Sequence, residues 1–230
     1  MANHEISFSD LIASSVHDMK NSLNVQVDEL EKIAGHCSAR GDIPGHQALV
    51  RVIYQASRMN ANLIQLLSLY KLGNASYPVD IAEHRLADVI DDALAHNRSI
   101  VQANRIAVAV ECADDCFWYL DRDLVTGVLV NALNNAYQYT RDKIRIVAQA
   151  SDGALHLRVE DNGPGYPASM LGAGGLDDAR GVNFLSNSTG LGFYFSGKVA
   201  GVHRNGERSG TLTVENGGAY GGGCFVLTLP

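Results

Sequence analysis

The sequence predicts an α+β protein in which an N-terminal antiparallel helical hairpin is followed by an α/β sandwich. Apolar residues recur every three or four positions through two long stretches of the first 73 residues, as expected for amphipathic helices. Beyond residue 80, helical patterns alternate with short β-prone runs. The 23 glycines, against 5 prolines, are concentrated after Gly153, which predicts loops where the backbone approaches a ligand or another segment closely.

The helical hairpin is predicted from residues 8–34, which contain neither Gly nor Pro, and from a second stretch that ends near Gly73. Gly35, Gly41, Pro44 and Gly45 separate the two helices. Two antiparallel helices cannot enclose a core, so each leaves an apolar stripe exposed. We expect two copies to pair into a four-helix bundle; the alternative is that the hairpin packs on the C-terminal part of the same chain.

A linker at residues 73–78 divides the chain into expected domains 1–75 and 76–230. The second domain is expected to contain helices at 86–102, 124–139 and 192–202, and strands at 106–111, 117–120, 143–150, 155–160, 211–215 and 224–229. Asp121 or Asp123 is available to cap the second of these helices. Asp152 and Gly153 predict a hairpin turn between two of the strands.

Composition excludes several classes of protein. With 25 acidic and 18 basic residues the net charge is −7, which argues against binding nucleic acid. No window reaches the roughly 18 consecutive apolar residues of a membrane span, and the start lacks a signal-peptide pattern. We therefore expect a cytoplasmic protein without a membrane segment. The four cysteines lack zinc-finger spacing and are expected to be reduced thiols.

The first candidate site lies within the first long helix. His17 and Asn21 are four residues apart and share one helix face, and Asp18 is adjacent. A neutral imidazole is a competent nucleophile near pH 7, and a neighbouring carboxylate can orient or accept its proton. Alone, this pattern is also typical of a solvated polar face.

The second candidate site is carried by polar and glycine-rich segments of the C-terminal domain. Asn131 and Asn135 share a helix face, and amide oxygens are hard ligands suited to Mg²⁺. Asp161 ends a strand and precedes Gly163 and Gly165, where it can accept a hydrogen bond from an exocyclic amine such as that of adenine. A last segment, Thr189, Gly190, Leu191 and Gly192, leads into a helix, a geometry that favours phosphate binding.

In this order, the segments resemble the transmitter core of a two-component sensor histidine kinase, and the resemblance runs from about residue 8 to the C-terminus. It implies a histidine kinase-like ATPase sandwich of the Bergerat type that binds ATP and Mg²⁺ under a lid at about residues 169–189. His17 matches the phosphoacceptor, Asp18 the acidic residue that assists its phosphorylation, and Asn21 the polar residue implicated in dephosphorylating the partner.

The resemblance also assigns the nucleotide site. Asn135 matches the magnesium-coordinating asparagine, with Asn131 as a further polar contact, and Asp161 matches the adenine-recognising aspartate. Gly163 and Gly165 match the glycines of the family's first glycine-rich motif. Gly190 and Gly192 match the phosphate-facing glycines of its second glycine-rich motif, to which Thr189 and Leu191 also belong.

The expected function is that of a histidine kinase that phosphorylates His17 from Mg-ATP and passes the phosphoryl group to an aspartate of a response regulator, with phosphatase activity toward it. Expected partners are a second copy of the chain, a receiver domain and a separate sensor protein. The alternative is a phosphotransfer or scaffold protein with a degenerate ATP site, because Gln138 stands where the family usually has a basic residue.

Overall fold

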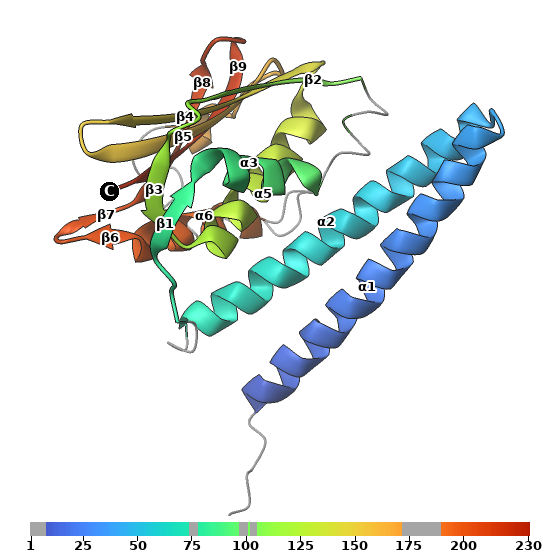
Figure 1. Cartoon of the computed structure of the whole chain (residues 1–230), viewed down its shortest axis with the longest axis horizontal. Coiled ribbons are helices and arrows are strands. Elements are labelled where there is room, and N and C mark those ends of the chain that lie inside the picture. Colours follow the sequence, from blue (N-terminus) through green and yellow to red (C-terminus); the bar gives the residue numbers. More distant parts are fainter. Residues whose placement is uncertain (1–7, 74–77, 97–100, 102–104, 172–189) are drawn as a thin grey trace, which may run out of the picture. The chain divides into compact units, whose positions relative to one another are not determined.

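The computed structural model describes residues 8–73, 78–96, 101, 105–171 and 190–230. The chain forms two compact units, Met1–Ser76 and Tyr77–Pro230 (Figure 1). The first unit is helical, and the second combines helices with a mixed β-sheet. This is the α+β organisation that the sequence predicts.

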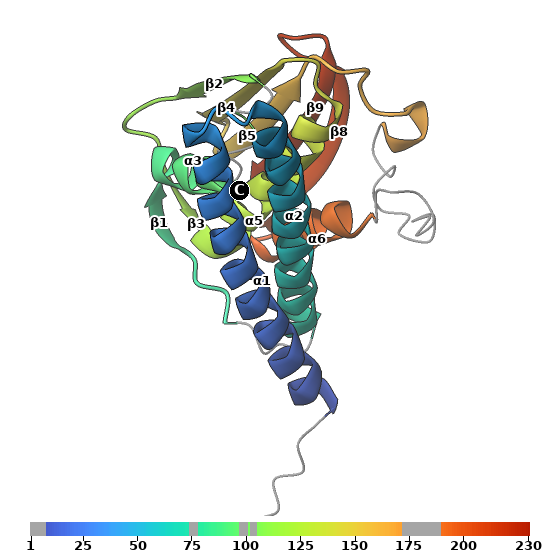
Figure 2. The same cartoon turned by 90° about the vertical axis from the view of Figure 1, so that its right-hand side faces the viewer.

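The helical unit consists of α1 (Phe8–Ala39) and α2 (Ile43–Gly73), which run antiparallel side by side (Figures 1 and 2). α2 begins at Ile43, six residues before Leu49, where the apolar pattern that predicts this helix begins. Asp42 caps it, since its Oδ1 accepts from the backbone N of Gly45 at 3.0 Å. Pro44 therefore lies in the first helical turn, where a backbone N–H is not needed, and does not break the helix.

Contacts between α1 and α2 are only partly apolar. Val16 and Ala34 of α1 and Val50 and Ile53 of α2 are buried. Polar contacts interrupt this core, since the Asn60 amide donates to Asn24 Oδ1 at 2.7 Å. The pair favours one register of the two helices, because a shift along the axis would break this hydrogen bond.

An apolar stripe remains exposed on the helical unit. Val52, Met59 and Leu66 follow one another at intervals of seven residues on α2 and are 51%, 58% and 46% exposed. Met19 and Ile33 of α1 are also about half exposed. A seven-residue apolar repeat is the pattern of a helix that packs against another helix.

The second unit is built on a five-stranded sheet of order β2-β4-β5-β9-β8. Its strands are β2 (Ala107–Cys112), β4 (Lys143–Ser151), β5 (Ala154–Asp161), β9 (Gly222–Leu229) and β8 (Thr211–Gly217). Only β2 and β4 pair in parallel, and the other neighbours are antiparallel.

Three helices cover one face of this sheet: α3 (Leu86–Ala95), α5 (Arg122–Tyr139) and α6 (Leu191–Val202) (Figure 2). Alternate strand residues such as Leu155, Leu157 and Phe225 point into the core beneath the helices and are almost fully buried. Most of these elements begin and end within two residues of the predicted ranges.

Three differences from the prediction are found in the described part of the second unit. The helix expected at 86–102 ends at Ala95, where His96 Nδ1 lies 2.8 Å from the Asp92 carbonyl; residues 97–100 and 102–104 lie outside the described part. β1 (Ala82–Arg85) and β3 (Phe117–Leu120) pair in a two-stranded sheet, of which β3 was predicted and β1 was not. The hairpin of β6 (Arg204–Asn205) and β7 (Arg208–Ser209) was not predicted.

A buried hydrogen-bonded junction joins the start of α5 to the end of α6. Asp121 caps α5 through Oδ1, which accepts from the Leu124 backbone N at 3.0 Å. The Asp121 backbone N–H donates to His203 Nε2 at 3.0 Å, and His203 Nδ1–H donates to the Val199 carbonyl at 2.7 Å. This arrangement requires neutral His203, and burial lowers the pKa of His203 below its ordinary value despite the opposing bond to Val199.

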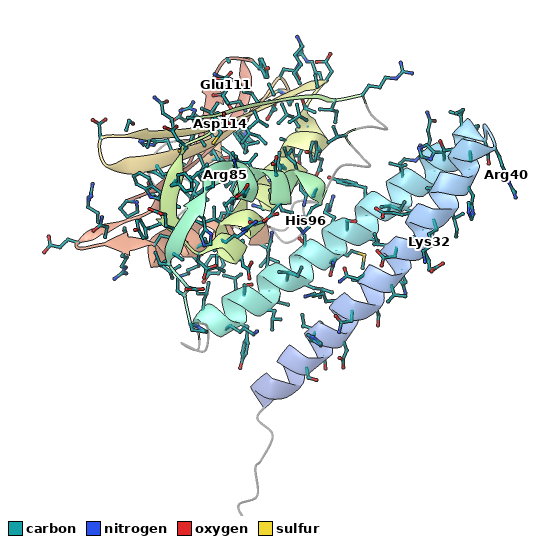
Figure 3. All side chains as sticks on the ribbon, in the orientation of Figure 1. Lys32, Arg40, Arg85, His96, Glu111 and Asp114 are labelled. Atoms are coloured by element: carbon teal, nitrogen blue, oxygen red, sulfur yellow. The ribbon has the colours of Figure 1, made fainter. Side chains whose placement is uncertain are left out.

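The other face of the sheet carries a chain of ion pairs across its strands. Arg145 of β4 pairs with Glu111 of β2, labelled in Figure 3, and with Glu160 of β5 at 3.2 Å. Arg158 also contacts Glu160, at 3.2 Å. Burial raises the pKa of Glu160, but hydrogen bonds from the Ala219 backbone and from these two guanidinium groups outweigh it, so the pKa lies below its ordinary value.

No helix in the described ranges combines the length and the hydropathy needed to cross a membrane.

Candidate nucleotide site and phosphoacceptor histidine

The imidazole of His17 is exposed on α1 and is contacted by both of the residues predicted to act with it. Its Nδ1 lies 3.5 Å from Asp18 Oδ1 and 3.3 Å from Asn21 Nδ2. The His17 side chain is 61% exposed, so solvent or a partner can reach it. Because both neighbours contact Nδ1, the other ring nitrogen, Nε2, is the one left for chemistry.

Asp161 ends β5 on the helix-covered face of the sheet and is buried. Its Oδ1 accepts from two backbone amides, Gly163 N at 2.6 Å and Gly223 N at 3.3 Å. These bonds fix the carboxylate while Oδ2 remains available as an acceptor. A buried acceptor in this state suits a ligand that presents an N–H donor, such as the exocyclic amine of adenine.

The two glycines after Asp161 are required by close backbone approaches. A Cβ on Gly163 would lie 2.3 Å from the carbonyl oxygen of Tyr139, the last residue of α5. Gly165 has φ +81°, and a Cβ there would lie 2.6 Å from Asn216 Oδ1. Both glycines therefore hold the chain against neighbouring segments, as the sequence predicts for a tight loop.

Tyr166, which follows these glycines, is a residue that the sequence analysis did not identify. Asn216 holds its backbone from the end of β8: Tyr166 N donates to Asn216 Oδ1 at 2.6 Å, and Asn216 Nδ2 donates to the Tyr166 carbonyl at 2.8 Å. The ring meets Phe193 of α6 edge to face at 6.0 Å. Burial, and then the charge of Asp161, raise the pKa of Tyr166 above its ordinary value.

Asn162 is a second residue that the analysis did not identify. Its Oδ1 accepts from Thr140 Oγ1 at 2.8 Å and from the backbone N of Arg141, Asp142 and Lys143 at 3.1–3.2 Å. One amide thus organises the turn between α5 and β4. No local pattern at Asn162 could indicate these bonds, because the turn that it contacts lies about twenty residues earlier in the chain.

The two candidate asparagines of α5, Asn131 and Asn135, lie in different environments. Asn131 is buried, and its Nδ2 donates to Ser196 Oγ of α6 at 3.2 Å. Asn135 is half-buried, and its amide has no hydrogen-bond partner among the described residues. A free amide oxygen fits a Mg²⁺ ligand, whereas Asn131 is engaged in joining α5 to α6.

The segment predicted to face phosphate is described from Gly190 onward; Thr189 and most of the expected lid lie outside the described residues. Gly190 has φ +60° and begins α6, and Leu191 is the first helical residue. A Cβ on Gly192 would lie only 2.0 Å from Asn131 Oδ1. Gly192 thus lets the N-terminus of α6 approach α5, and this terminus offers backbone N–H groups suited to phosphate.

Gln138, at the place where a basic residue was expected, is exposed and donates from Nε2 to the Tyr139 hydroxyl at 3.3 Å. The structure therefore places Asp161, Gly163 and Gly165 at the end of β5 and brings Gly192, in the first turn of α6, against Asn131 of α5. His17, Asp18 and Asn21 form a separate group in the helical unit.

The chain is similar to known proteins over both of its units. Residues 120–230 match the family described as histidine kinase-, DNA gyrase B-, and HSP90-like ATPase. The chain is 27% identical over 160 residues to the two-component sensor PhoQ of Pseudomonas aeruginosa, covering 68% of this chain and 34% of that protein. It is 25% identical to the signal transduction histidine-protein kinase AfsQ2 of Streptomyces coelicolor, covering 100% of this chain and 43% of that protein.

Solved structures show the same fold. The histidine kinase AdeS of Acinetobacter baumannii has a TM-score of 0.58 at 18% identity, covering 89% of this chain and 96% of that one. The catalytic domain of the histidine kinase ThkA has a TM-score of 0.55 at 21% identity, covering 65% and 95%. The chain thus spans less than half the length of the two curated relatives and nearly the whole of these two structures.

The ATPase match lies within the C-terminal unit and the similarity to AfsQ2 extends over the helical pair as well, so the chain is similar along its length to the transmitter cores of two-component histidine kinases, and residues 120–230 match their ATPase domain.

Proposed function

We propose that this protein is a histidine kinase that transfers the γ-phosphoryl group of ATP to His17 and then to an aspartate of a response regulator receiver domain. The observation that carries the proposal is the exposed His17 imidazole, contacted at Nδ1 by Asp18 and Asn21, in a chain that also has an ATP-binding unit. An exposed nucleophile suits an acceptor that must be reached first by a nucleotide and later by a second protein.

The proposed transfer proceeds through Nε2 of His17. With the proton on Nδ1 and directed at Asp18, the Nε2 lone pair attacks the γ-phosphorus. An N–P bond forms as the bond to the bridging oxygen breaks, and ADP leaves. Asp18 stabilises the positive charge that develops on the ring, or accepts the Nδ1 proton.

The nucleotide is proposed to bind at the ends of β5, α5 and α6. Asp161 Oδ2 accepts from the exocyclic amine of adenine, while the backbone N–H groups at the start of α6 face the phosphates. Asn135 is the proposed Mg²⁺ ligand, because its amide is free while that of Asn131 is engaged. Mg²⁺ would offset the negative charge of the phosphates, which matters more where Gln138 supplies no cation.

The helical unit is proposed to pair with a second copy. The seven-residue repeat of Val52, Met59 and Leu66 exposes apolar surface that a four-helix bundle would bury. A response regulator is the proposed second partner. Asn21, one helical turn from His17, can orient a water molecule for removal of phosphate from that partner, which is the proposed phosphatase activity.

Labelling with γ-³²P-ATP and Mg²⁺ tests the proposal in the wild type and in the His17→Ala, His36→Ala and Asn135→Ala variants. His36 is an exposed histidine on the same helix and serves as the matched control. We expect label in the wild type and His36→Ala, none in His17→Ala, and little in Asn135→Ala. Label that persists in His17→Ala would refute the phosphoacceptor assignment.

The same assay separates the kinase from the phosphotransfer protein considered as the alternative. A wild-type protein that takes no label from ATP, but accepts it from a phosphorylated receiver domain, would refute the kinase proposal and support phosphotransfer through His17.

A further inference from the structure

The ring of Tyr166 lies beside the group proposed to recognise adenine. A Cβ placed on Gly223 would be 3.1 Å from Tyr166 Cε2 and 2.8 Å from Asp161 Oδ2, so the ring and the carboxylate oxygen both lie close against Gly223 of β9. Tyr166 is therefore a neighbour of the carboxylate that is proposed to accept from adenine.

The backbone of Tyr166 is held more firmly than an ordinary loop residue. The two hydrogen bonds with Asn216 satisfy both backbone groups of Tyr166, since Tyr166 N–H donates to Asn216 Oδ1 at 2.6 Å and Asn216 Nδ2 donates to the Tyr166 carbonyl at 2.8 Å. On the side of α6, Phe193 contacts the ring edge to face and itself packs on Phe225 at 6.1 Å. The ring therefore has a fixed position, as is required of a group that reads a ligand.

The hydroxyl of Tyr166 has no hydrogen-bond partner among the described residues, although burial and the charge of Asp161 raise the pKa of Tyr166. The raised pKa keeps the group protonated, so it remains a donor. Tyr166 is half-buried, and its hydroxyl is a donor that can serve a ligand with an acceptor atom.

We propose that Tyr166 reads the nucleotide base: its hydroxyl donates a hydrogen bond to a ring nitrogen of adenine, Asp161 accepts from the exocyclic amine, and Asn216 acts as a positioning residue for Tyr166. The inference rests on nucleotide binding, which is part of the proposed function, and adds to it a second base contact. A purine that lacks the relevant ring nitrogen would leave the hydroxyl unpaired and bind more weakly.

The test is calorimetric binding of ATP and of its 1-deaza, 3-deaza and 7-deaza analogues, each with Mg²⁺, to the wild type and to Tyr166→Phe. We expect Tyr166→Phe to bind ATP about two- to tenfold more weakly. One deaza analogue should bind the wild type more weakly by a similar factor, yet bind Tyr166→Phe as well as ATP does. Tyr119→Phe, an exposed tyrosine of β3, is the control and should leave all affinities unchanged.

Two variants test the positioning role. Asn216→Ala should weaken ATP binding and abolish the deaza penalty, because the ring is no longer held. Compared with Asn216→Ala, Asn216→Asp should restore part of the ATP affinity and part of the deaza penalty. Its carboxylate still accepts from Tyr166 N–H but cannot donate to the Tyr166 carbonyl. A structural defect alone would weaken the binding of ATP and of its three deaza analogues equally and would leave the deaza penalty in place.

Several outcomes overturn the inference. If Tyr166→Phe binds ATP as tightly as the wild type, the Tyr166 ring only packs with Phe193 and Phe225. If the deaza penalties are equal in the wild type and in Tyr166→Phe, the hydroxyl does not contact the base. Both leave labelling of His17 untouched, so they are distinguishable from failure of the kinase proposal. A wild type that binds no nucleotide would overturn both.

Discussion

Nδ1 of His17 lies 3.3 Å from the amide nitrogen of Asn21, and the same ring nitrogen lies 3.5 Å from Asp18 Oδ1. The two contacts require opposite tautomers. Asn21 donates to Nδ1 only when that nitrogen carries no proton, whereas Asp18 accepts from Nδ1 only when it does. The Asp18 contact leaves the Nε2 lone pair free for attack, and the Asn21 contact places the proton on Nε2.

Asn21→Ala should therefore raise the fraction of His17 with the proton on Nδ1. Loss of one exposed hydrogen bond, about 0.5 kcal/mol, shifts this ratio about twofold. ¹⁵N chemical shifts of the ring nitrogens, recorded above the titration range of histidine, measure the ratio directly. Asn24→Ala, on the same helix, is the control, and equal ratios in the wild type and Asn21→Ala would show that Asn21 does not bias the tautomer.

Asp161→Asn should weaken ATP binding without unfolding the domain. The amide oxygen of asparagine can still accept from Gly163 and Gly223, but its NH₂ group replaces an acceptor with a donor. Loss of a charge-assisted hydrogen bond costs about 1.5–3 kcal/mol, which is tenfold or more in affinity.

Calorimetry should also show that Asp161→Asn discriminates less against inosine triphosphate, whose base presents an oxygen in place of the amine. Asp152→Asn, in the exposed β4–β5 turn, is the control. If Asp161→Asn binds ATP as tightly as the wild type, Asp161 does not contact the base.

Gly192→Ala should destabilise the C-terminal unit by about 1–3 kcal/mol, because its methyl group would lie 2.0 Å from Asn131 Oδ1. Gly197→Ala, one and a half turns further along α6, is the matched control since nothing lies within 4 Å of its Cβ position. The control should be neutral or more stable by up to about 1 kcal/mol. Urea denaturation measures both, and equal stabilities would contradict the close approach of α5 and α6.

His203 should make the C-terminal unit less stable in mild acid. Its pKa is lowered in the folded state, so the unfolded chain takes up the proton first as the pH falls below about 6.5. The free energy of unfolding should then decrease, by at most about 1.4 kcal/mol per pH unit, until the folded pKa is reached.

Urea denaturation between pH 7.5 and 5.5 tests the role of His203 against the His203→Gln variant. The variant should be less stable at neutral pH and should show a smaller loss of stability on acidification. His156→Gln is the control because His156, on the other face of the sheet, is only partly buried. Parallel pH profiles for the wild type and His203→Gln would show that another group causes the acid sensitivity.

The sequence predicts the elements with strong local patterns and fails where a contact is distant in the chain. The β4–β5 hairpin follows from Asp152 and Gly153, which both adopt positive φ in the structure, at 55° and 68°. Strand β1 has four residues and no apolar repeat, and it forms only because β3 pairs with it more than thirty residues later.

For the candidate site residues too, the sequence predicts local arrangements but not contacts between distant segments. The spacing of His17 and Asn21 predicts that they share one helix face, with Asp18 adjacent to His17, since helical geometry is local. The contacts of Tyr166 with Asn216 and of Asn162 with Thr140 depend on the packing of separate strands and turns. Asn131 was predicted to contact the nucleotide, and its burial against Ser196 could be seen only once α6 lay against α5.

Mass-spectrometric location of the phosphoryl group after incubation with ATP and Mg²⁺ tests the central claim most directly. The kinase proposal predicts a single acid-labile phosphate on the peptide that contains His17, strongly reduced in Asn135→Ala and present in His36→Ala. A phosphate on another residue, or none on His17 in a protein that binds ATP, would contradict it.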